Sequence, residues 1–427
     1  MWPSVKHLVI HEDRHAPDTK LPAGLLSLSI GEIEADVIAQ LQLPASLRTL
    51  KLTSPDLTTF PPPGLRWPVT LESLAIASFK LTFFDGRRFP HLKSLEVRFD
   101  RSAESPEIFL IPANVASNLR RLRLECGAHL WTPSFASQFA SLSILTLSAL
   151  HPLTEEHIPR SVTSLKLFDV TLARLNLSEH AALKEVSLLS CELRDLSRVW
   201  FPQGIQKVNL GFNRLSTLRV NGVCRVPPNT TELNLYKNEL TSLGEDDLPL
   251  YLERLSADAN KIDTVDLGSY RYLQSINLNR NAVQFLYDGM LPRSALQVYL
   301  AENDLQVLHL SAPHLALRQL VIESDYLHHL VLSGATQLES LSMHYPTEQQ
   351  TFKTLVLPSC LAVIEFENWH RSQHDHDMMD QLHHLPRLHT LIVDTWDGAS
   401  AAAHRLPARL RWVHDMSGHL FQRPLRL

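Results

Sequence analysis

One short apolar phrase recurs along the whole chain of 427 residues. It consists of an apolar residue, two variable positions, an apolar residue, one variable position and a third apolar residue. Successive copies begin 20 to 27 residues apart, and most spacings lie between 20 and 23. A repeat of this period predicts a stack of similar coils rather than a fold around one central core. The nineteen copies begin at Val5, Leu25, Leu47, Leu71, Leu92, Leu119, Leu142, Val162, Leu183, Ile205, Thr230, Leu252, Leu273, Ala295, Leu317, Leu338, Leu361, Leu388 and Leu410.

Each copy ends in a short alternation, as in Leu233-Asn234-Leu235. Alternation places the apolar side chains on one face of a strand and the polar side chains on the other. A single strand of this length cannot bury its apolar face, so successive copies must stack in parallel and share a continuous core.

An asparagine lies three residues after the last apolar position in five consecutive copies. An asparagine side chain at a sharp turn can bond backbone groups of its own coil and of the adjacent coil. We therefore expect a structural ladder formed by Asn213, Asn238, Asn260, Asn281 and Asn303.

These residues resemble the leucine-rich repeat motif, Leu-x-x-Leu-x-Leu-x-x-Asn/Cys-x-Leu. The copy from Leu273 to Val283 matches at every apolar position, and Cys191 falls on the Asn/Cys position of its copy. The resemblance covers essentially the whole chain. It implies a leucine-rich repeat solenoid, shaped as a horseshoe or arc, with one long parallel β-sheet on the concave face. The expected organisation is a single domain over residues 1–427 of about 19 repeats, most regular over 162–345, without a separate catalytic domain.

A second apolar series lies about ten residues after the start of the eighth to fifteenth copies. It predicts short strands, turns and few helices on the convex side, similar to the compact repeats of roughly 21–22 residues in bacterial members of the family. An ordinary α/β domain would instead need about 10–15 residues of helical periodicity between strands. Prolines such as Pro44, Pro202 and Pro249 oppose a helix at those junctions. The second series begins at Leu172, Leu193, Leu215, Leu240, Ile262, Val283, Leu305 and Leu327.

Charge and composition limit the classes of partner and the location. The formal net charge of −5 gives no overall basic field to attract nucleic acid. No apolar run approaches the roughly 18–20 residues of a membrane span, and no signal-peptide core follows Met1. The cysteines are scattered without paired spacing, which favours a reducing, cytoplasmic location. We expect a monomer that binds neither nucleic acid nor membranes. The four cysteines are Cys126, Cys191, Cys224 and Cys360.

Two histidine-containing segments raise the question of a zinc-dependent enzyme. His11, Glu12 and His15 match the string His-Glu-x-x-His, which requires a helix to place both histidines on one face. This string instead follows strand residues and precedes Pro17, which favours a polar turn. A later segment also carries possible ligands, but residues 375–385 read as a short solvated helix with acidic residues near its start. Its histidines are His370, His374, His376, His383, His384 and His389.

No other motif predicts an enzyme or a cofactor. The glycines have no phosphate-loop spacing, and no Gly-x-Ser-x-Gly elbow is present. Some bacterial effectors join leucine-rich repeats to a ubiquitin-ligase domain with a Cys-x-Asp motif, but Cys191 is followed by Glu-Leu. We therefore expect no catalytic residue, no metal and no cofactor.

The variable positions of the phrases should line the concave face. Aromatic residues and arginines among small polar residues are typical of interface centres. We expect a non-enzymatic scaffold that binds a protein partner there. Three alternatives remain: a substrate receptor of a ubiquitin ligase, a bacterial leucine-rich-repeat effector, and the zinc-dependent enzyme. A ubiquitin-ligase receptor would be expected to carry an F-box, but no F-box-like segment precedes Val5. The candidate partner-binding residues are Arg98, Arg121, Arg123, Lys166, Phe168, Leu189, Asn209, Tyr236, Arg254, Asn277 and Tyr299.

Overall fold

The computed structural model describes residues 5–11, 21–63, 66–78, 80–98, 108–125, 131–148, 153–312, 316–344, 352–367, 381–393, 410, 412–415 and 420–422. Contacts divide the chain into two compact units. Unit 1 comprises Met1–Leu193 and Ser197–Ile205, and unit 2 comprises Arg194–Leu196 and Gln206–Leu427. Both units are built from the same repeat, and a single domain over 1–427 remains a prediction.

Unit 1 contains a parallel sheet to which each copy of the phrase contributes one strand. Burial alternates along the strands, with Leu50 and Leu52 buried and Lys51 exposed in one of them. The strands pair in chain order and in one register. They are β1 (His7–Ile10), β2 (Ser27–Ile30), β3 (Thr49–Thr53), β5 (Ser73–Ala77), β7 (Ser94–Arg98), β9 (Arg121–Glu125), β10 (Ile144–Ser148), β11 (Ser164–Phe168) and β13 (Glu185–Leu189).

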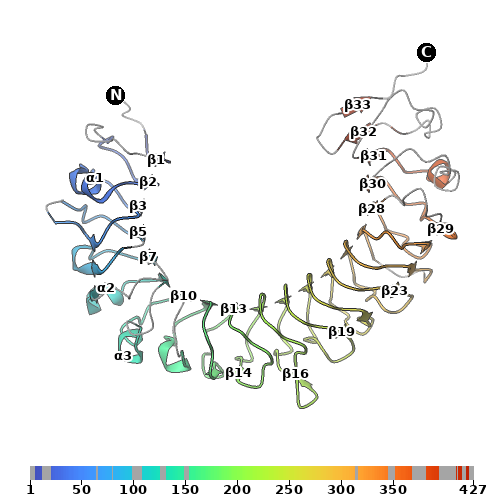
Figure 1. The fold of residues 1–427 in the computed structure, drawn as a ribbon, viewed down its shortest axis with the longest axis horizontal. Coiled ribbons are helices and arrows are strands. Elements are labelled where there is room, and N and C mark those ends of the chain that lie inside the picture. The colour runs from blue at the N-terminus through green and yellow to red at the C-terminus, as the bar shows by residue number, and fades with distance from the viewer. Residues whose placement is uncertain are drawn as a thin grey trace. The chain divides into compact units, whose positions relative to one another are not determined.

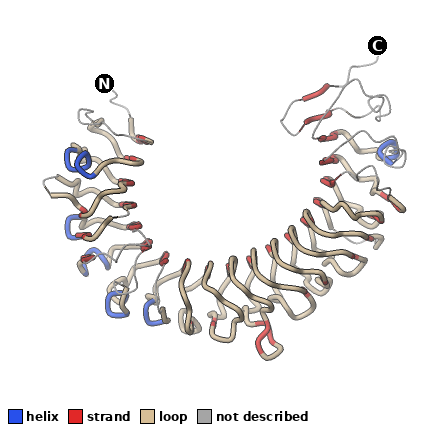
Figure 2. Tube along the Cα trace, viewed as in Figure 1, coloured by secondary structure: helices blue, strands red, loops and turns tan. Residues whose placement is uncertain are grey.

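Unit 2 contains a parallel sheet of the same kind. Its last parallel strand also pairs with the antiparallel β33 (Leu420–Gln422). The predicted solenoid with a parallel sheet is therefore confirmed in each unit, and within each unit these strands line the inner side of the bend (Figure 2). The strands are β15 (Lys207–Asn209), β18 (Glu232–Asn234), β20 (Arg254–Ser256), β22 (Ser275–Asn277), β24 (Gln297–Leu300), β26 (Gln319–Ile322), β28 (Ser340–His344), β30 (Val363–Glu367), β31 (Thr390–Val393) and β32 (Trp412–Asp415).

The outer side of unit 1 carries short helices as well as short strands (Figure 2). One of the helices begins with proline, and the side chain of Thr132 caps it by accepting a bond from the N–H of Phe135. The helices are α1 (Ala35–Gln40), η1 (Gly86–Arg88), α2 (Ala113–Ala116), α3 (Pro133–Ala136) and η3 (Glu155–His157), and the strands are β4 (Thr59–Phe60), β6 (Phe83–Asp85), β8 (Ile108–Leu110), β12 (Leu175–Asn176) and β14 (Val199–Trp200).

The outer side of unit 2 consists mainly of short strands and turns, and residues 381–384 are helical. The second apolar series accounts for these strands, because Leu286, Leu308 and Leu330 point into the core from three adjacent ones. The strands are β19 (Ser242–Leu243), β21 (Thr264–Val265), β23 (Phe285–Leu286), β25 (Val307–His309), β27 (His329–Val331) and β29 (Thr354–Val356).

Proline enters many coils through one recurrent turn. The carbonyl of Pro249 accepts a hydrogen bond from the N–H of Leu252, and Pro202 and Ile205 are joined in the same way. Since proline has a fixed φ and no N–H, it favours the turn and ends the preceding segment. The prolines therefore set the point at which each strand begins.

A β-hairpin interrupts the coil that begins at Ile205. Strands β16 (Arg219–Val220) and β17 (Val223–Cys224) are antiparallel, and they are joined by Asn221 and Gly222 with φ of 53° and 81°. Positive φ at both turn residues is typical of a type I′ hairpin. The guanidinium of Arg219 donates to the carbonyl of Gly222 at 3.0 and 2.7 Å. The hairpin projects from the side of unit 2 opposite its parallel sheet (Figure 1).

A left-handed residue precedes each asparagine of the ladder. None of these residues is glycine, although a side chain makes this conformation costly. Since the position recurs coil after coil, the tight turn out of the sheet requires it. The residues and their φ angles are Phe212 (56°), Lys237 (52°), Ala259 (54°), Arg280 (56°) and Glu302 (55°).

Among the described residues, no helix has the length and apolar character needed to cross a membrane.

Candidate functional site

The middle positions of adjacent strands form one row across the concave face of unit 2. Asn209 pairs with Asn234, Asn234 with Ser256, Ser256 with Asn277, and Asn277 with Tyr299. All five side chains are half-buried. The parallel register therefore places the polar row that the alternation predicts on one surface.

The three asparagines of this row have a fixed orientation. The amide oxygens of Asn209, Asn234 and Asn277 accept bonds from backbone N–H groups two residues later, at 3.0, 2.9 and 3.1 Å. This bond stabilises the end of each strand and leaves the side-chain NH2 as the group available to a partner. The row therefore offers hydrogen-bond donors.

An aromatic cluster borders the row, and we call Phe212, Tyr236 and Lys237 the aromatic corner. The rings of Phe212 and Tyr236 meet edge to face, with centroids 5.0 Å apart. The ammonium of Lys237 lies 4.9 Å from the centre of the first ring and 5.4 Å from the second. Phe212 is 48% exposed, and its contact with Tyr236 makes the two rings one apolar patch at the surface.

Tyr236 is among the binding residues predicted from the sequence, whereas Phe212 and Lys237 are not. Both lie at the left-handed position, outside the alternating part of the phrase. Phe212 could have been found from the sequence, because it is a large apolar residue directly before a ladder asparagine. The neighbouring coils have a polar or small residue at that position.

The remaining apolar candidates lie on strands of the two sheets. Phe168 pairs with Leu189 on adjacent strands of unit 1, and both are half-buried. In unit 2 the half-buried Tyr299 donates its hydroxyl to the side-chain oxygen of Gln319 at 3.3 Å.

Arg254 is not an available cation. It pairs with Glu232 on the adjacent strand, and Lys207 contacts the same carboxylate at 3.0 Å from the strand on the other side. Burial raises the pKa of Glu232, but the hydrogen bonds and charges of Arg254 and Lys207 outweigh it, so the net pKa is lowered. Arg254 therefore belongs to an ion network of the sheet, and a partner that used it would have to compete with Glu232.

Arg98 and Arg123 in unit 1 also form ion pairs with glutamates of the sheet. Arg98 contacts Glu96 at 2.7 Å, and Arg123 contacts Glu125 at 2.5 Å. Longer contacts of 3.6 Å join each arginine to the other carboxylate, so the four residues form one network across two adjacent strands. Among the residues that the structure describes, Arg121 and Lys166 have no ion-pair partner.

The ladder asparagines bond neighbouring coils to one another. Asn238, Asn260, Asn281 and Asn303 each accept a bond from a backbone N–H in the preceding coil, at 3.0 to 3.1 Å. Their NH2 groups donate to carbonyls of their own coil and of the preceding one. Asn213 donates to Leu210 and Gly211 within its own coil.

Cys191 contacts the carbonyl oxygens that an asparagine at its position would reach. Its sulfur lies 3.4 Å from the oxygen of Leu189 and 3.8 Å from that of Leu167 in the preceding coil. Burial raises the pKa of the thiol to about 12, so it is protonated at neutral pH. A buried, protonated thiol is a poor nucleophile, which favours a structural role.

The histidine candidates fall largely outside the described residues, which exclude Glu12, His15 and 368–380. His11, His383, His384 and His389 are described. Within the described ranges no group of three or more His, Cys, Asp or Glu side chains is arranged to hold a metal ion.

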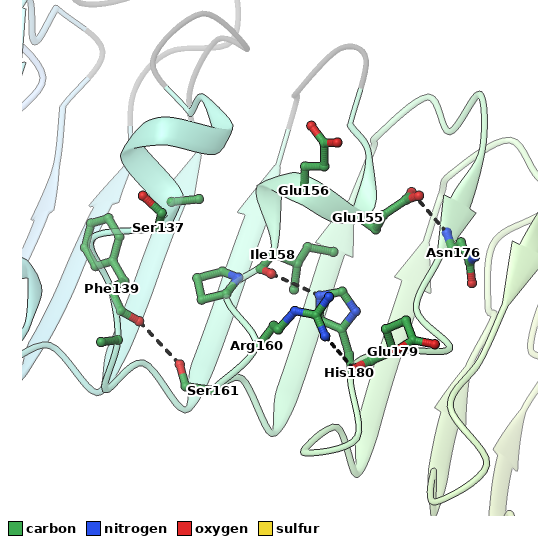
Figure 3. A pocket seen from close by; sticks show the side chains of 13 residues that line it. Ser137, Phe139, Glu155, Glu156, Ile158, Arg160, Ser161, Asn176, Glu179 and His180 are labelled. Carbon is green, nitrogen blue, oxygen red and sulfur yellow. Dashed lines mark hydrogen bonds between the residues drawn. The ribbon is translucent and has the colours of Figure 1, made fainter.

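Described residues of unit 1 line a hollow on each side of its coils. One, of about 680 Å³, lies on the outer side between coils and includes Glu155, Arg160, Glu179 and His180 (Figure 3). The imidazole of His180 is buried and donates from Nε2 to the carbonyl of Ile158 at 3.0 Å, which bonds two coils together. The other hollow, of about 740 Å³, lies on the concave face along β9, β10 and β11 and includes Arg121, Lys166 and Phe168.

No protein-family model matches the sequence, and no curated protein matches it. The fold is similar to that of a leucine-rich repeat protein from Leptospira interrogans, over 92% of this chain and 96% of that chain, with 19% identity and a TM-score of 0.59. The circular leucine-rich repeat protein CroV588 is similar over 92% of this chain and 66% of that chain, with 16% identity and a TM-score of 0.53. TLR13, solved in complex with ssRNA13, is similar over 92% of this chain and 74% of that chain, with 14% identity and a TM-score of 0.51. These likenesses concern the fold, and the chain is a leucine-rich repeat solenoid.

Proposed function

We propose that this chain is a non-enzymatic interaction scaffold that binds a protein partner on the concave face of unit 2. The observation that carries the proposal is the aromatic corner. The exposed ring of Phe212, the half-buried ring of Tyr236 and a lysine lie together at the border of a half-buried polar row. Aromatic residues of this kind supply much of the binding energy in protein interfaces.

The neighbouring asparagines support the same proposal. Because their oxygens are already bonded to the backbone, their NH2 groups are held in place before a partner arrives. Groups that are already ordered lose little conformational entropy on binding. A partner that presents carbonyl or carboxylate oxygens opposite Asn209 and Asn234 would satisfy these donors.

The experiment compares capture of a partner by the wild-type chain and by the double variant Phe212→Ala, Tyr236→Ala. Proteins captured from a native lysate are identified, and the affinity of the strongest is measured with purified components. We expect the double variant to bind more than about tenfold more weakly, because both rings of the corner are lost. The matched control is Tyr251→Ala, Tyr272→Ala, which removes another exposed aromatic pair.

Two results would contradict the proposal. The first is equal loss of binding in the double variant and in the matched control. The second is retained binding in the double variant together with loss when residues 368–387 are replaced by a Gly/Ser segment. Circular dichroism of each variant verifies that the fold is intact.

A cytoplasmic location and a monomeric state form part of the same proposal. Trapping of thiols with an alkylating agent at the moment of cell lysis tests the location, since a reducing compartment leaves all four cysteines reactive after unfolding. Light scattering of the purified chain tests the monomer.

A further inference from the structure

The concave hollow of unit 1 has an excess of cationic side chains although the whole chain is acidic. Four lining residues are cationic and two are anionic. A local excess of this kind attracts groups of opposite charge at close range. The cationic lining residues are Arg121, Arg123, Lys166 and Lys184, and the anionic ones are Glu96 and Glu185.

These four cationic side chains differ in whether a group of the protein already binds them. Arg123 is held by Glu125 and Glu96, and Lys184 donates to the carbonyl of Gly204 at 3.4 Å. Arg121 and Lys166 have no ion-pair partner within the described part of the chain, and both are exposed. They are therefore the positions at which an anion binds most favourably, because no carboxylate of the described residues has to be displaced.

The two available cations flank one surface. Lys166 aligns with Thr146 on the adjacent strand, and Thr146 aligns with Arg123 on the next. Arg121 lies on that same third strand, two residues before Arg123. Strand spacings of about 4.8 Å and a rise of about 3.3 Å per residue place the two Cα atoms roughly 12 Å apart. An extended segment spans this distance between residues three or four positions apart.

The carboxylates of the hollow indicate the kind of anion. Glu96 and Glu185 would repel a phosphodiester chain, which carries a charge at every residue. A peptide can place its carboxylates opposite Arg121 and Lys166 and neutral residues opposite the glutamates. The half-buried ring of Phe168 adds apolar surface beside them.

We propose that the concave hollow of unit 1 binds an acidic peptide segment whose carboxylates pair with Arg121 and Lys166. This inference rests on the proposed function, since the segment would belong to a protein partner. It extends that function to a second surface, with a chemistry different from that of the aromatic corner.

The test uses the full chain and a fluorescein-labelled decapeptide that has glutamate at every fourth position and glycine or serine elsewhere, which we call the spaced-glutamate peptide. Fluorescence anisotropy is the readout. We expect saturable binding that weakens as salt is raised, and binding about tenfold or more weaker for Arg121→Glu, Lys166→Glu. The control Arg271→Glu, Lys353→Glu makes the same change in net charge at exposed residues outside the hollow. It should retain affinity within about threefold.

Three outcomes would overturn the inference. They are no saturable binding of the spaced-glutamate peptide, equal weakening by the hollow variant and the control, or tighter binding of a single-stranded RNA 13-mer with the same sensitivity to Arg121→Glu, Lys166→Glu. The aromatic-corner variant Phe212→Ala, Tyr236→Ala separates this test from that of the proposed function. It should leave binding of the spaced-glutamate peptide unchanged even if it abolishes partner capture.

Discussion

The side-chain oxygen of Asn238 accepts a hydrogen bond from the N–H of Leu215, one coil earlier, at 3.0 Å. Its NH2 group donates at 2.9 Å to Leu210 in that earlier coil and at 2.9 Å to Leu235 in its own. A single side chain thus satisfies backbone groups of two coils where they leave the sheet. The neighbouring ladder asparagines repeat this arrangement.

Replacement of a ladder asparagine should destabilise unit 2 markedly. Asn260→Ala leaves the N–H of Leu240 and the carbonyls of Leu235 and Ala257 without these partners. We expect a loss of about 1–3 kcal/mol in the free energy of unfolding, measured by urea denaturation. Asn260→Asp is the close control, because it retains the acceptor and loses the donors, and it should also destabilise. A denaturation midpoint equal to that of wild type for Asn260→Ala would contradict this role.

Relief of the left-handed backbone should stabilise the chain. Ala259 has φ of 54°, a conformation that glycine adopts without a Cβ penalty. Ala259→Gly should raise the free energy of unfolding by up to about 1 kcal/mol, because the strain relieved exceeds the added entropy of the unfolded chain. Ala257→Gly, at a buried position two residues earlier, should lower it. The two thermal midpoints should therefore move in opposite directions, and a shift in the same direction would refute the argument.

The ion network at Glu232 should make stability depend on acid pH. The pKa of this carboxyl is lowered in the folded chain, so its contribution is present above its ordinary value near 4.5. That contribution is lost as the pH falls through the lower, folded value. Glu232→Gln should be less stable than wild type at pH 7, and the difference should shrink when both are denatured at pH 3. A difference independent of pH would mean that charge is not its cause.

The Tyr270 hydroxyl should be needed for unit 2. It donates to the carbonyl of Gly244 and accepts from the N–H of Leu248, both at 2.9 Å, and burial raises its pKa to about 12. Tyr270→Phe leaves the buried N–H of Leu248 unpaired, which should cost about 1–3 kcal/mol in calorimetric stability. Tyr272→Phe changes an exposed tyrosine nearby and should have little effect. Equal stability of the two variants would show that the hydroxyl contributes nothing.

The periodic features of the fold were predictable because they depend on spacing alone. The row from Asn209 to Tyr299 follows from one strand per phrase in one register. The short helices of unit 1 were harder to predict, since the longer coils there lack a clear helical period. Each of these helices is only three to six residues long, and side-chain caps such as Thr132 are present at some of them and absent at others.

The candidate site was predictable only in part. The variable positions indicated its surface. The ion pairs of Arg98 and Arg123 with carboxylates of their own strands, and that of Arg254 with a carboxylate of the adjacent strand, depend on side-chain reach. The contact of Phe212 with Tyr236 depends on a left-handed turn that places a residue outside the alternation beside the next coil.

The hairpin of β16 and β17 shows where this architecture can accept extra length. It lengthens one coil on the side away from the sheet, while Asn209 and Asn234 on the flanking strands keep their pairing. A guest sequence inserted between Asn221 and Gly222 would grow outward from a closed turn and leave the concave surface undisturbed. The same tip offers an attachment point for a fluorophore or an immobilisation tag.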